Sequence, residues 1–567
     1  MAEYFSPGVY VEEYDNSPRS IEGVGTSTAG FVGLAEKGPV VGAPQLVTGF
    51  KDFKQQFGGF LSEFGYGEYR FLANSVEQFF VNGGTRCFVM RVAPKDAACA
   101  STEKGILKVS AKNPGAWGNK VQVTLNTVKK QKMQLLEKKG DGFRAKSVEG
   151  FREGDILEFE GKYARIKTIF DNIVTFEDEI PDKAVDNAII PKALLYLVTA
   201  DLSVRYGDDA ENYQDLSFNI QSPKYIGSRL AGSELIDVEI DPIEEAINPV
   251  EAILGDGVES GVFMLEGGAD GSVSKVNAGT FIGEDNGPGK RTGIQSFVEN
   301  NLVSMMAVPG VTMPEVMVAL VSHCENLRSR FAVLDMPADL YKPADLINYR
   351  NIIDSTYAAM YHPWIEVFDR SSNKSDYIPP SGAVMGVYSR TDINRGVHKA
   401  PANETVFCTG LKVNYTKDEQ DILNPEGVNL IRTLPGQGIR IWGARTASSN
   451  SSFKYVNVRR LFIFVEESIK ANTNWVVFEP NDATLWQRVE LTISGFLDGL
   501  WRNGMLAGDS PATSYFVEIG TSTMTRDDIM NGRLICNIGI APSRPAEFVI
   551  FRVTQFTAEA GGGEGGE

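Results

Sequence analysis

The chain has 567 residues, of which 43% are apolar and 23% charged, and its formal net charge is −18. This length predicts about three or four domains, each able to bury a core of its own. Because Lys and Arg supply the attraction to phosphate, the acidic balance argues against a general nucleic-acid or anionic-membrane binder.

No run of residues reaches the roughly 18 apolar positions of a membrane span. The first residues have neither the basic nor the apolar region of a signal peptide. The five cysteines are scattered without a CxxC pair, which indicates reduced thiols. We therefore expect a protein made in the cytoplasm that does not insert into membranes.

The N-terminal segment, residues 1–27, predicts an extended arm. The β-prone run Val9–Tyr14 lies between Pro7 and Pro18, so a helix is disfavoured there. Such a strand either pairs inside its own domain or adds to a neighbouring molecule, and the sequence leaves both open.

Residues 28–100 and 268–422 share an α/β pattern and predict one discontinuous domain with helices packed on a mixed sheet. The expected strands are 31–35, 87–92, 302–308, 331–335 and 364–368, and the expected helices are 68–81, 312–330 and 343–360. Between the two pieces, residues 101–267 contain short alternating runs that predict an inserted, β-rich domain.

Residues 423–559 predict a C-terminal α/β domain. Apolar residues recur at helical spacing from Leu485 to Leu500, which indicates an amphipathic helix over 482–503. The run Phe548–Phe556 is strongly β-prone and needs a cover. Residues 560–567 are Gly-rich and predict a flexible tail.

The sequence has no recognisable catalytic, cofactor-binding or metal-binding motif. The loop Gly283–Arg291 lacks the spacing of a phosphate loop, and no HExxH is present. A hydrolase that uses His323, Cys324 or His362 remains an alternative hypothesis.

Several motifs together resemble those of contractile tail sheath proteins, the family of phage tails, R-type pyocins and extracellular contractile injection systems. They run in order over most of the chain. The motifs are Asn113–Asn119, Leu265–Gly271, Tyr361–Val367, Ile378–Gly382, Arg390–Asn403, Leu423–Arg432, Ile441–Thr446, Val458–Arg460 and Pro545–Phe548.

The resemblance implies a structural subunit, without catalysis or cofactor, that polymerises as stacked six-fold rings around an inner tube and contracts to drive the tube through a cell envelope. It implies that both terminal strands join a sheet of neighbouring protomers in the inner, C-terminal domain, with the inserted domain outermost. The residues assigned to this exchange are Tyr4, Val9, Tyr10, Val11, Tyr14, Phe548, Val549, Ile550, Phe551 and Val553.

The polar side of the 482–503 helix and a short turn after Thr525 are the candidate tube-facing surface, although both are equally well explained as solvated. The residues are Arg488, Glu490, Asp498, Arg502, Arg526, Asp527 and Asp528. The implied partners are further copies of the chain, a tube protein, a baseplate and a tail terminator or cap. The implied location is a virion tail or tail-like particle, released by lysis or kept in the cell. A non-contractile shell or adhesin polymer remains an alternative.

Overall fold

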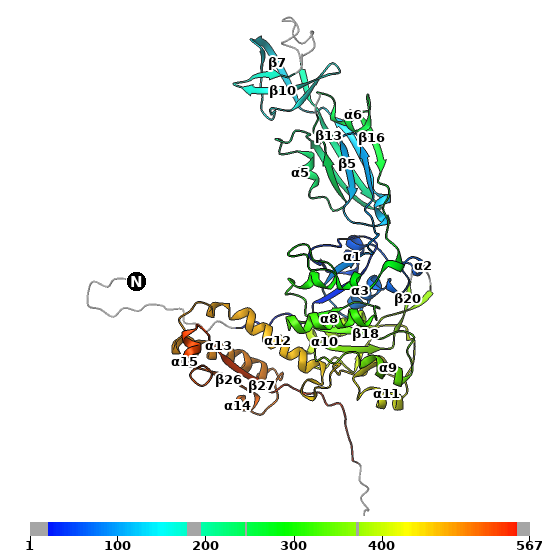
Figure 1. Ribbon diagram of the computed structural model, residues 1–567, viewed down its shortest axis with the longest axis vertical. Helices are drawn as coiled ribbons and strands as arrows, with labels where there is room; N and C mark the ends of the chain where they lie inside the picture. The colour runs from blue at the N-terminus through cyan, green and yellow to red at the C-terminus, as the bar shows by residue number, and fades with distance from the viewer. Residues whose placement is uncertain (1–20, 178–193, 244–245, 370–373, 553–567) are drawn as a thin grey trace, which may run out of the picture.

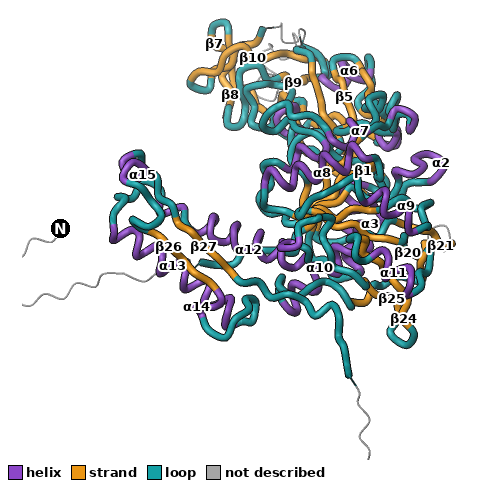
Figure 2. The backbone as a smooth tube through the Cα atoms, turned by 60° about the horizontal axis from the view of Figure 1, so that its bottom comes forward, coloured by secondary structure: helices purple, strands orange, loops and turns teal. Residues whose placement is uncertain are grey.

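The computed structural model describes residues 21–177, 194–243, 246–369 and 374–552. Within them the molecule is elongated. A β-rich arm extends from a central α/β domain, and a smaller domain of helices and a hairpin lies to one side (Figure 1; Figure 2 shows the same parts from another direction). No described helix is both long and apolar enough to cross a bilayer.

The central domain is built on a nine-stranded mixed sheet, which confirms the predicted fold class. Its strand order is β2-β3-β1-β17-β18-β19-β24-β25-β22. Neighbours from β3 to β24 pair in parallel, and the pairs at both ends of the sheet are antiparallel. The strands are β1 Ala29–Leu34, β2 Gln45–Val47, β3 Cys87–Val92, β17 Met305–Ala307, β18 Phe331–Asp335, β19 Ala358–His362, β22 Glu404–Thr405, β24 Val428–Leu434 and β25 Gly438–Ile441.

Helices cover both faces of this sheet. Phe31 and Val32 are neighbours on β1 but belong to different buried clusters, because successive strand residues point to opposite faces. One face packs against α1 Phe50–Phe57, α3 Leu72–Val81 and α10 Ser381–Arg395. The other packs against α8 Pro314–Leu327, α9 Pro343–Arg350 and α11 Lys417–Leu423.

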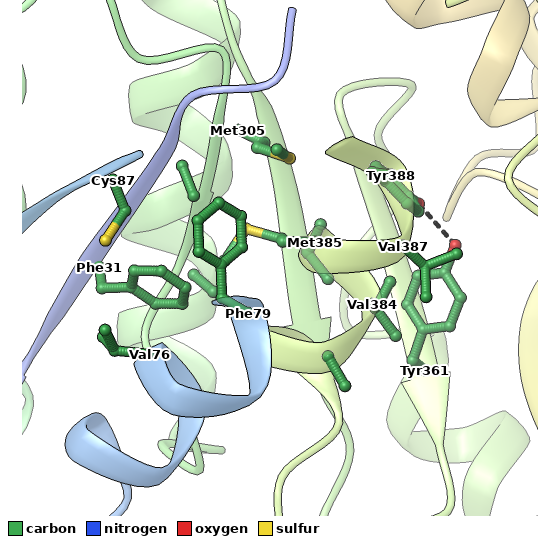
Figure 3. Packing of buried hydrophobic residues seen from close by; sticks show 14 of the residues in the cluster. Phe31, Val76, Phe79, Cys87, Met305, Tyr361, Val384, Met385, Val387 and Tyr388 are labelled. Atoms are coloured by element: carbon green, nitrogen blue, oxygen red, sulfur yellow. Dashed lines mark hydrogen bonds between the residues drawn. The ribbon is translucent and has the colours of Figure 1, made fainter. Parts of the chain in front are cut away.

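Helices α3 and α10 approach each other closely because α10 carries glycine at the contact. A Cβ at Gly382 would lie 2.2 Å from the Ser75 carbonyl oxygen, and one at Gly386 would lie 2.5 Å from that of Phe79. Figure 3 shows the Phe79 ring beside Met385 and the hydrogen bond between the Tyr361 and Tyr388 hydroxyls. The two glycines thus set the distance between the helices.

The prediction of one helix over 343–360 was wrong at its C-terminal end. The helix ends at Arg350, and β19 begins at Ala358. Ala and Met favour helices in isolation, but here Ala358 and Met360 lie in the buried centre of the sheet, and packing overrides propensity. The strand expected at 364–368 exists as β20 Ile365–Asp369, but it belongs to a separate antiparallel sheet.

The inserted region contains two modules, one inside the other. The inner module pairs two antiparallel sheets over their own core. Its strands are β4 Ser101–Lys104, β5 Leu107–Ala111, β6 Gln122–Val128, β13 Thr199–Tyr206, β14 Asp209–Leu216, β15 Ile236–Ile240 and β16 Ser260–Met264. Between β6 and β13 the chain forms a closed barrel with a separate core. Its strands are β7 Lys132–Lys139, β8 Gly142–Ala145, β9 Ile156–Phe159, β10 Lys162–Phe170, β11 Ile173–Phe176 and β12 Leu194–Leu197.

The predicted domain boundary at residue 423 falls inside the central sheet, since β24 and β25 follow it. The C-terminal part has its own core, formed by α12 Val456–Asn472, α13 Ala483–Arg502 and the hairpin of β26 Tyr515–Ile519 and β27 Cys536–Ile540. Helix α13 matches the predicted amphipathic helix, and the Asp482 side chain caps it by accepting from the Leu485 N–H at 2.9 Å.

Candidate functional site

The β26–β27 hairpin is a two-stranded sheet with only one covered face. Val517 and Ile538, which are paired across the strands, join the core with α13, whereas Phe516 on the other face is 54% exposed. Among the described residues neither strand has a second partner, so both outer edges are open. Two strands alone form a marginal sheet, and open edges accept further strands.

An exposed apolar segment follows the hairpin in the sequence. Residues 548–552 form neither helix nor strand, and the side chains of Phe548, Val549, Ile550 and Phe551 are 67–86% exposed. Four adjacent large apolar residues in water are unfavourable for an isolated molecule and typical of a segment that binds elsewhere. Val553 lies outside the described residues.

This segment begins at a carboxylate clamp. Arg445 donates to both oxygens of Glu547 at 2.8 Å, Asn424 donates to Oε1 at 2.7 Å, and the Tyr455 hydroxyl donates to Oε2 at 2.8 Å. Burial opposes ionisation, but these hydrogen bonds outweigh it and lower the pKa of Glu547 to about 2. Residues 543–547, here named the C-terminal root, are thereby fixed to the body of the protein.

A corresponding N-terminal root, residues 21–26, lies against the C-terminal domain. Ile21 is buried in the core of that domain, and Gly23 packs on Phe464, whose ring would lie 2.7 Å from an added Cβ. The predicted exchange residues Tyr4, Val9, Tyr10, Val11 and Tyr14 precede this root and lie outside the described residues.

The candidate tube-facing residues do not form one cluster with one role. Arg488 and Glu490 are exposed on α13, with the Arg488 guanidinium 4.8 Å from the centre of the Trp475 ring. Asp498 and Arg502 pair with each other at 2.8 Å. The turn after Thr525 is α15 Arg526–Met530, where Asp528 accepts from Thr525 in a capping box. Arg526 and Asp527 are exposed on the same turn.

The three residues of the alternative hydrolase hypothesis, His323, Cys324 and His362, are buried in the protein interior. Burial and the nearby Arg330 lower the pKa of His323 to about 3, and burial raises that of the Cys324 thiol to about 12. His362 is buried, lies 2.9 Å from the Tyr415 hydroxyl, and has a pKa lowered to about 4 by burial and by Lys412. The arrangement keeps both imidazoles neutral and the thiol protonated.

Sequence reasoning did not assign the clamp. Glu547 and Arg445 each stand in a motif that carries the family resemblance, Pro545–Phe548 and Ile441–Thr446. Their pairing spans about a hundred residues, so only a signal of spatial proximity would have joined them.

Comparison with known proteins identifies two matching domains. Residues 288–447 match the family described as phage tail sheath protein central domain, and residues 448–556 match the phage tail sheath C-terminal domain. The border between the two matches lies after β25 and before α12, where the central sheet ends.

Individual relatives are similar over parts of the chain. The tail sheath protein of Salmonella phage ViI is 32% identical over 24% of this chain and 23% of its own length. That of Burkholderia phage BcepMu is 24% identical over 50% of this chain and 63% of its own length. The matched part therefore spans less than two thirds of either relative.

The fold is similar to that of a solved sheath. The sheath complex of an extracellular contractile injection system, PVC, in the contracted state is 21% identical with a TM-score of 0.53, covering 99% of this chain and 100% of that one. The two domain matches assign residues 288–556 to the central and C-terminal domains of phage tail sheath proteins, the relatives are tail sheath proteins, and the likeness of fold extends over nearly the whole chain.

Proposed function

We propose that the chain is a non-catalytic structural subunit of a contractile tail sheath. In this proposal it polymerises as stacked six-fold rings around an inner tube, between a baseplate and a terminator or cap, and contracts to drive the tube through a target envelope. The observation that carries the proposal is the hairpin with two open edges, on the same molecule as an exposed apolar segment.

Strand exchange between protomers would use these features together. The C-terminal segment from Phe548 and the N-terminal arm, which includes Val9–Tyr14, would each add a strand to the β26–β27 hairpin of a different neighbour. The resulting four-stranded sheet would be held by main-chain hydrogen bonds and would bury Phe548 and Phe551. Such joints can survive a large rotation of the domains between them.

Contraction in this proposal needs no nucleotide. If the extended polymer is metastable and the contracted one buries more surface, each protomer releases a modest free energy and the polymer adds these contributions together. The exposed side of α13, with Arg488 and Glu490, and the α15 turn are the proposed contacts with the tube.

Electron microscopy of the purified protein, alone and with its cognate tube protein, tests the proposal. We expect hollow tubes of uniform diameter in an extended and a shorter, wider form. Variants that lack residues 1–20, or that end before Glu547, should remain folded by thermal unfolding and circular dichroism but should form no tubes. Tubes of normal length from both truncations would refute strand exchange, and a single polymer length would favour a non-contractile shell.

A further inference from the structure

Helix α12 holds the N-terminal root along one face. Three of its side chains, at steps of eight and four residues, bind successive backbone groups of the root, so they lie on one side of the helix. The root runs antiparallel to the helix. The contacts are Arg460 Nη2 to the Thr26 carbonyl at 2.9 Å, the Val24 N–H to Ser468 Oγ at 3.1 Å, and Asn472 Nδ2 to the Glu22 carbonyl at 3.0 Å.

The C-terminal root is held at the opposite end of the same helix. Tyr455, the residue just before α12, donates its hydroxyl to Glu547, and Asn457 in the first turn donates to the Ser543 carbonyl at 3.2 Å. A helix rises about 1.5 Å per residue, so Tyr455 and Asn472 are separated by about 25 Å along its axis. Figures 1 and 2 show α12 running between the central domain and the hairpin domain.

A buried ion pair fixes the helix to the central domain. Arg460 donates to both carboxylate oxygens of Asp392 on α10, at 2.9 and 2.6 Å, and each side chain is only 3% exposed. The Arg460 guanidinium also lies over the Tyr388 ring, 4.8 Å from its centre, and Thr26 donates to the same carboxylate at 2.7 Å. Arg460 therefore joins the N-terminal root, α12 and α10 at one point.

From this arrangement we propose that α12 is the strut that carries tension between the two terminal arms. Tension that one neighbour applies to the N-terminal arm is transmitted to the C-terminal half of α12 through Asn472 and Ser468. At the N-terminal end of α12, Tyr455 transmits this tension to Glu547, and from there it reaches the C-terminal arm and the next neighbour. The Arg460–Asp392 ion pair connects α12 to α10, so that a displacement of α12 also displaces the central domain. This inference rests on the proposed strand exchange and adds the residues through which exchange transmits force.

The test weakens each root without changing the arms. The variants are Asn472→Ala at the N-terminal root, Glu547→Gln at the C-terminal root, and the double variant. The controls are Lys470→Ala, an exposed neighbour on α12, and Lys417→Gln, from an exposed pair on α11. Sheath polymers of each full-length protein, with the cognate tube where it is needed for assembly, are sheared at increasing rates, and fragment lengths are measured by electron microscopy.

We expect both single variants to break at lower shear than the wild type and both controls to break like the wild type. Contacts loaded in series fail at the weaker one, so the double variant should break at the shear of the weaker single variant. Their effects on protomer melting temperature should instead add, because the sites are far apart. Folded variant protomers that form no polymer while the controls do would also support the proposal.

Two results would overturn it. Root variants whose polymers resist shear like the wild type would show that tension does not pass through α12. Additive losses of shear resistance in the double variant would indicate independent destabilisation instead of a load path. If the variant lacking residues 1–20 and the variant ending before Glu547 both still gave normal tubes, strand exchange itself would be refuted, which is a different outcome from wild-type shear resistance in the root variants alone.

Discussion

Glu547 shows how one ionised side chain can define where a chain leaves its domain. Its carboxylate accepts hydrogen bonds from Arg445, Asn424 and Tyr455, and four exposed apolar residues follow it directly. A carboxylate held in this way is stabilised in its charged form. Glu547 is therefore the last residue of the fixed C-terminal root, and the exposed apolar segment begins directly after it.

The clamp predicts a defined pH dependence. The pKa of Glu547 is about 2 in the folded protein and near 4.3 in an unfolded chain, so its stabilisation is fully present above about pH 5 and disappears as the pH falls toward 2. Glu547→Gln should weaken the root by on the order of 2 kcal/mol at pH 7, which is about a 30-fold faster exchange of the Ser543 amide, which donates to the Met505 carbonyl. Exchange measured by mass spectrometry from pH 7 to 2 checks this, and a gap between wild type and variant that persists at pH 2 would contradict it.

The contact between α3 and α10 gives a second prediction. Gly382→Ala puts a methyl group against the Ser75 carbonyl and should force the helices apart, at a cost of about 1–3 kcal/mol. The matched control is Gly495→Ala in α13, where no atom lies within 4 Å of the added Cβ and helix propensity favours Ala by about 1 kcal/mol. Thermal unfolding should show a lower midpoint for the first variant and an equal or higher one for the second. A midpoint for Gly382→Ala equal to that of the wild type would contradict the packing argument.

At the scale of elements, the sequence predicted those whose local pattern agrees with their packing. The strands Cys87–Val92 and Phe331–Asp335 and the helix α13 were recognised because apolar periodicity and end signals coincide in them. Helix α12 was not, since its buried face carries Asn457, Arg459 and Arg460, polar residues whose side chains bind groups of the central domain: the His398 carbonyl, the Tyr357 hydroxyl and Asp392. Burial of such residues depends on tertiary partners that no local pattern contains.

At the scale of elements, we predict that the exposed face of α13 contacts the tube protein. Leu491 is 68% exposed there, beside Arg488 and Glu490. If this face contacts the tube, Arg488→Glu should reduce copurification of the tube protein and lower the melting temperature of the protomer only slightly, because the exposed contact of Arg488 with the Trp475 ring contributes about 0.5–1 kcal/mol. Lys417→Glu on α11 is the charge-matched control. Equal recovery of the tube protein with both variants would place the tube contact elsewhere.

At the scale of the whole molecule, the modules are nested, and the sequence did not predict this nesting. We expected one inserted β-rich domain over residues 101–267, and its alternating runs did not reveal the closed barrel as a separate module between β6 and β13. Closure depends on pairing between β9 and β12 and between β12 and β7, strands distant in sequence. The predicted start of the C-terminal domain at residue 423 lies before the end of the central sheet. This sheet also includes β24, which pairs with β19, a strand distant from it in sequence.

The barrel can therefore be removed as a unit. Val128 and Thr199 are paired directly across β6 and β13, so the two ends of the inserted barrel already lie side by side. Replacing residues 129–198 with Asn-Gly should close β6 and β13 into an ordinary hairpin. We expect a soluble protomer whose melting temperature is within a few degrees of the wild type and which still assembles. Aggregation of this variant would show that polar contacts such as Arg165 to the Ile243 carbonyl are required.

Because Val128 and Thr199 are adjacent, a foreign domain can be inserted between them in place of the barrel. Any domain whose own termini lie close together could be joined there without altering the path of the flanking strands. Figure 1 places the barrel at the end of the protomer opposite the hairpin. A reporter, an antigen or a cell-binding module fused at this point would be displayed in as many copies as there are protomers, while the parts proposed to generate movement kept their native sequence.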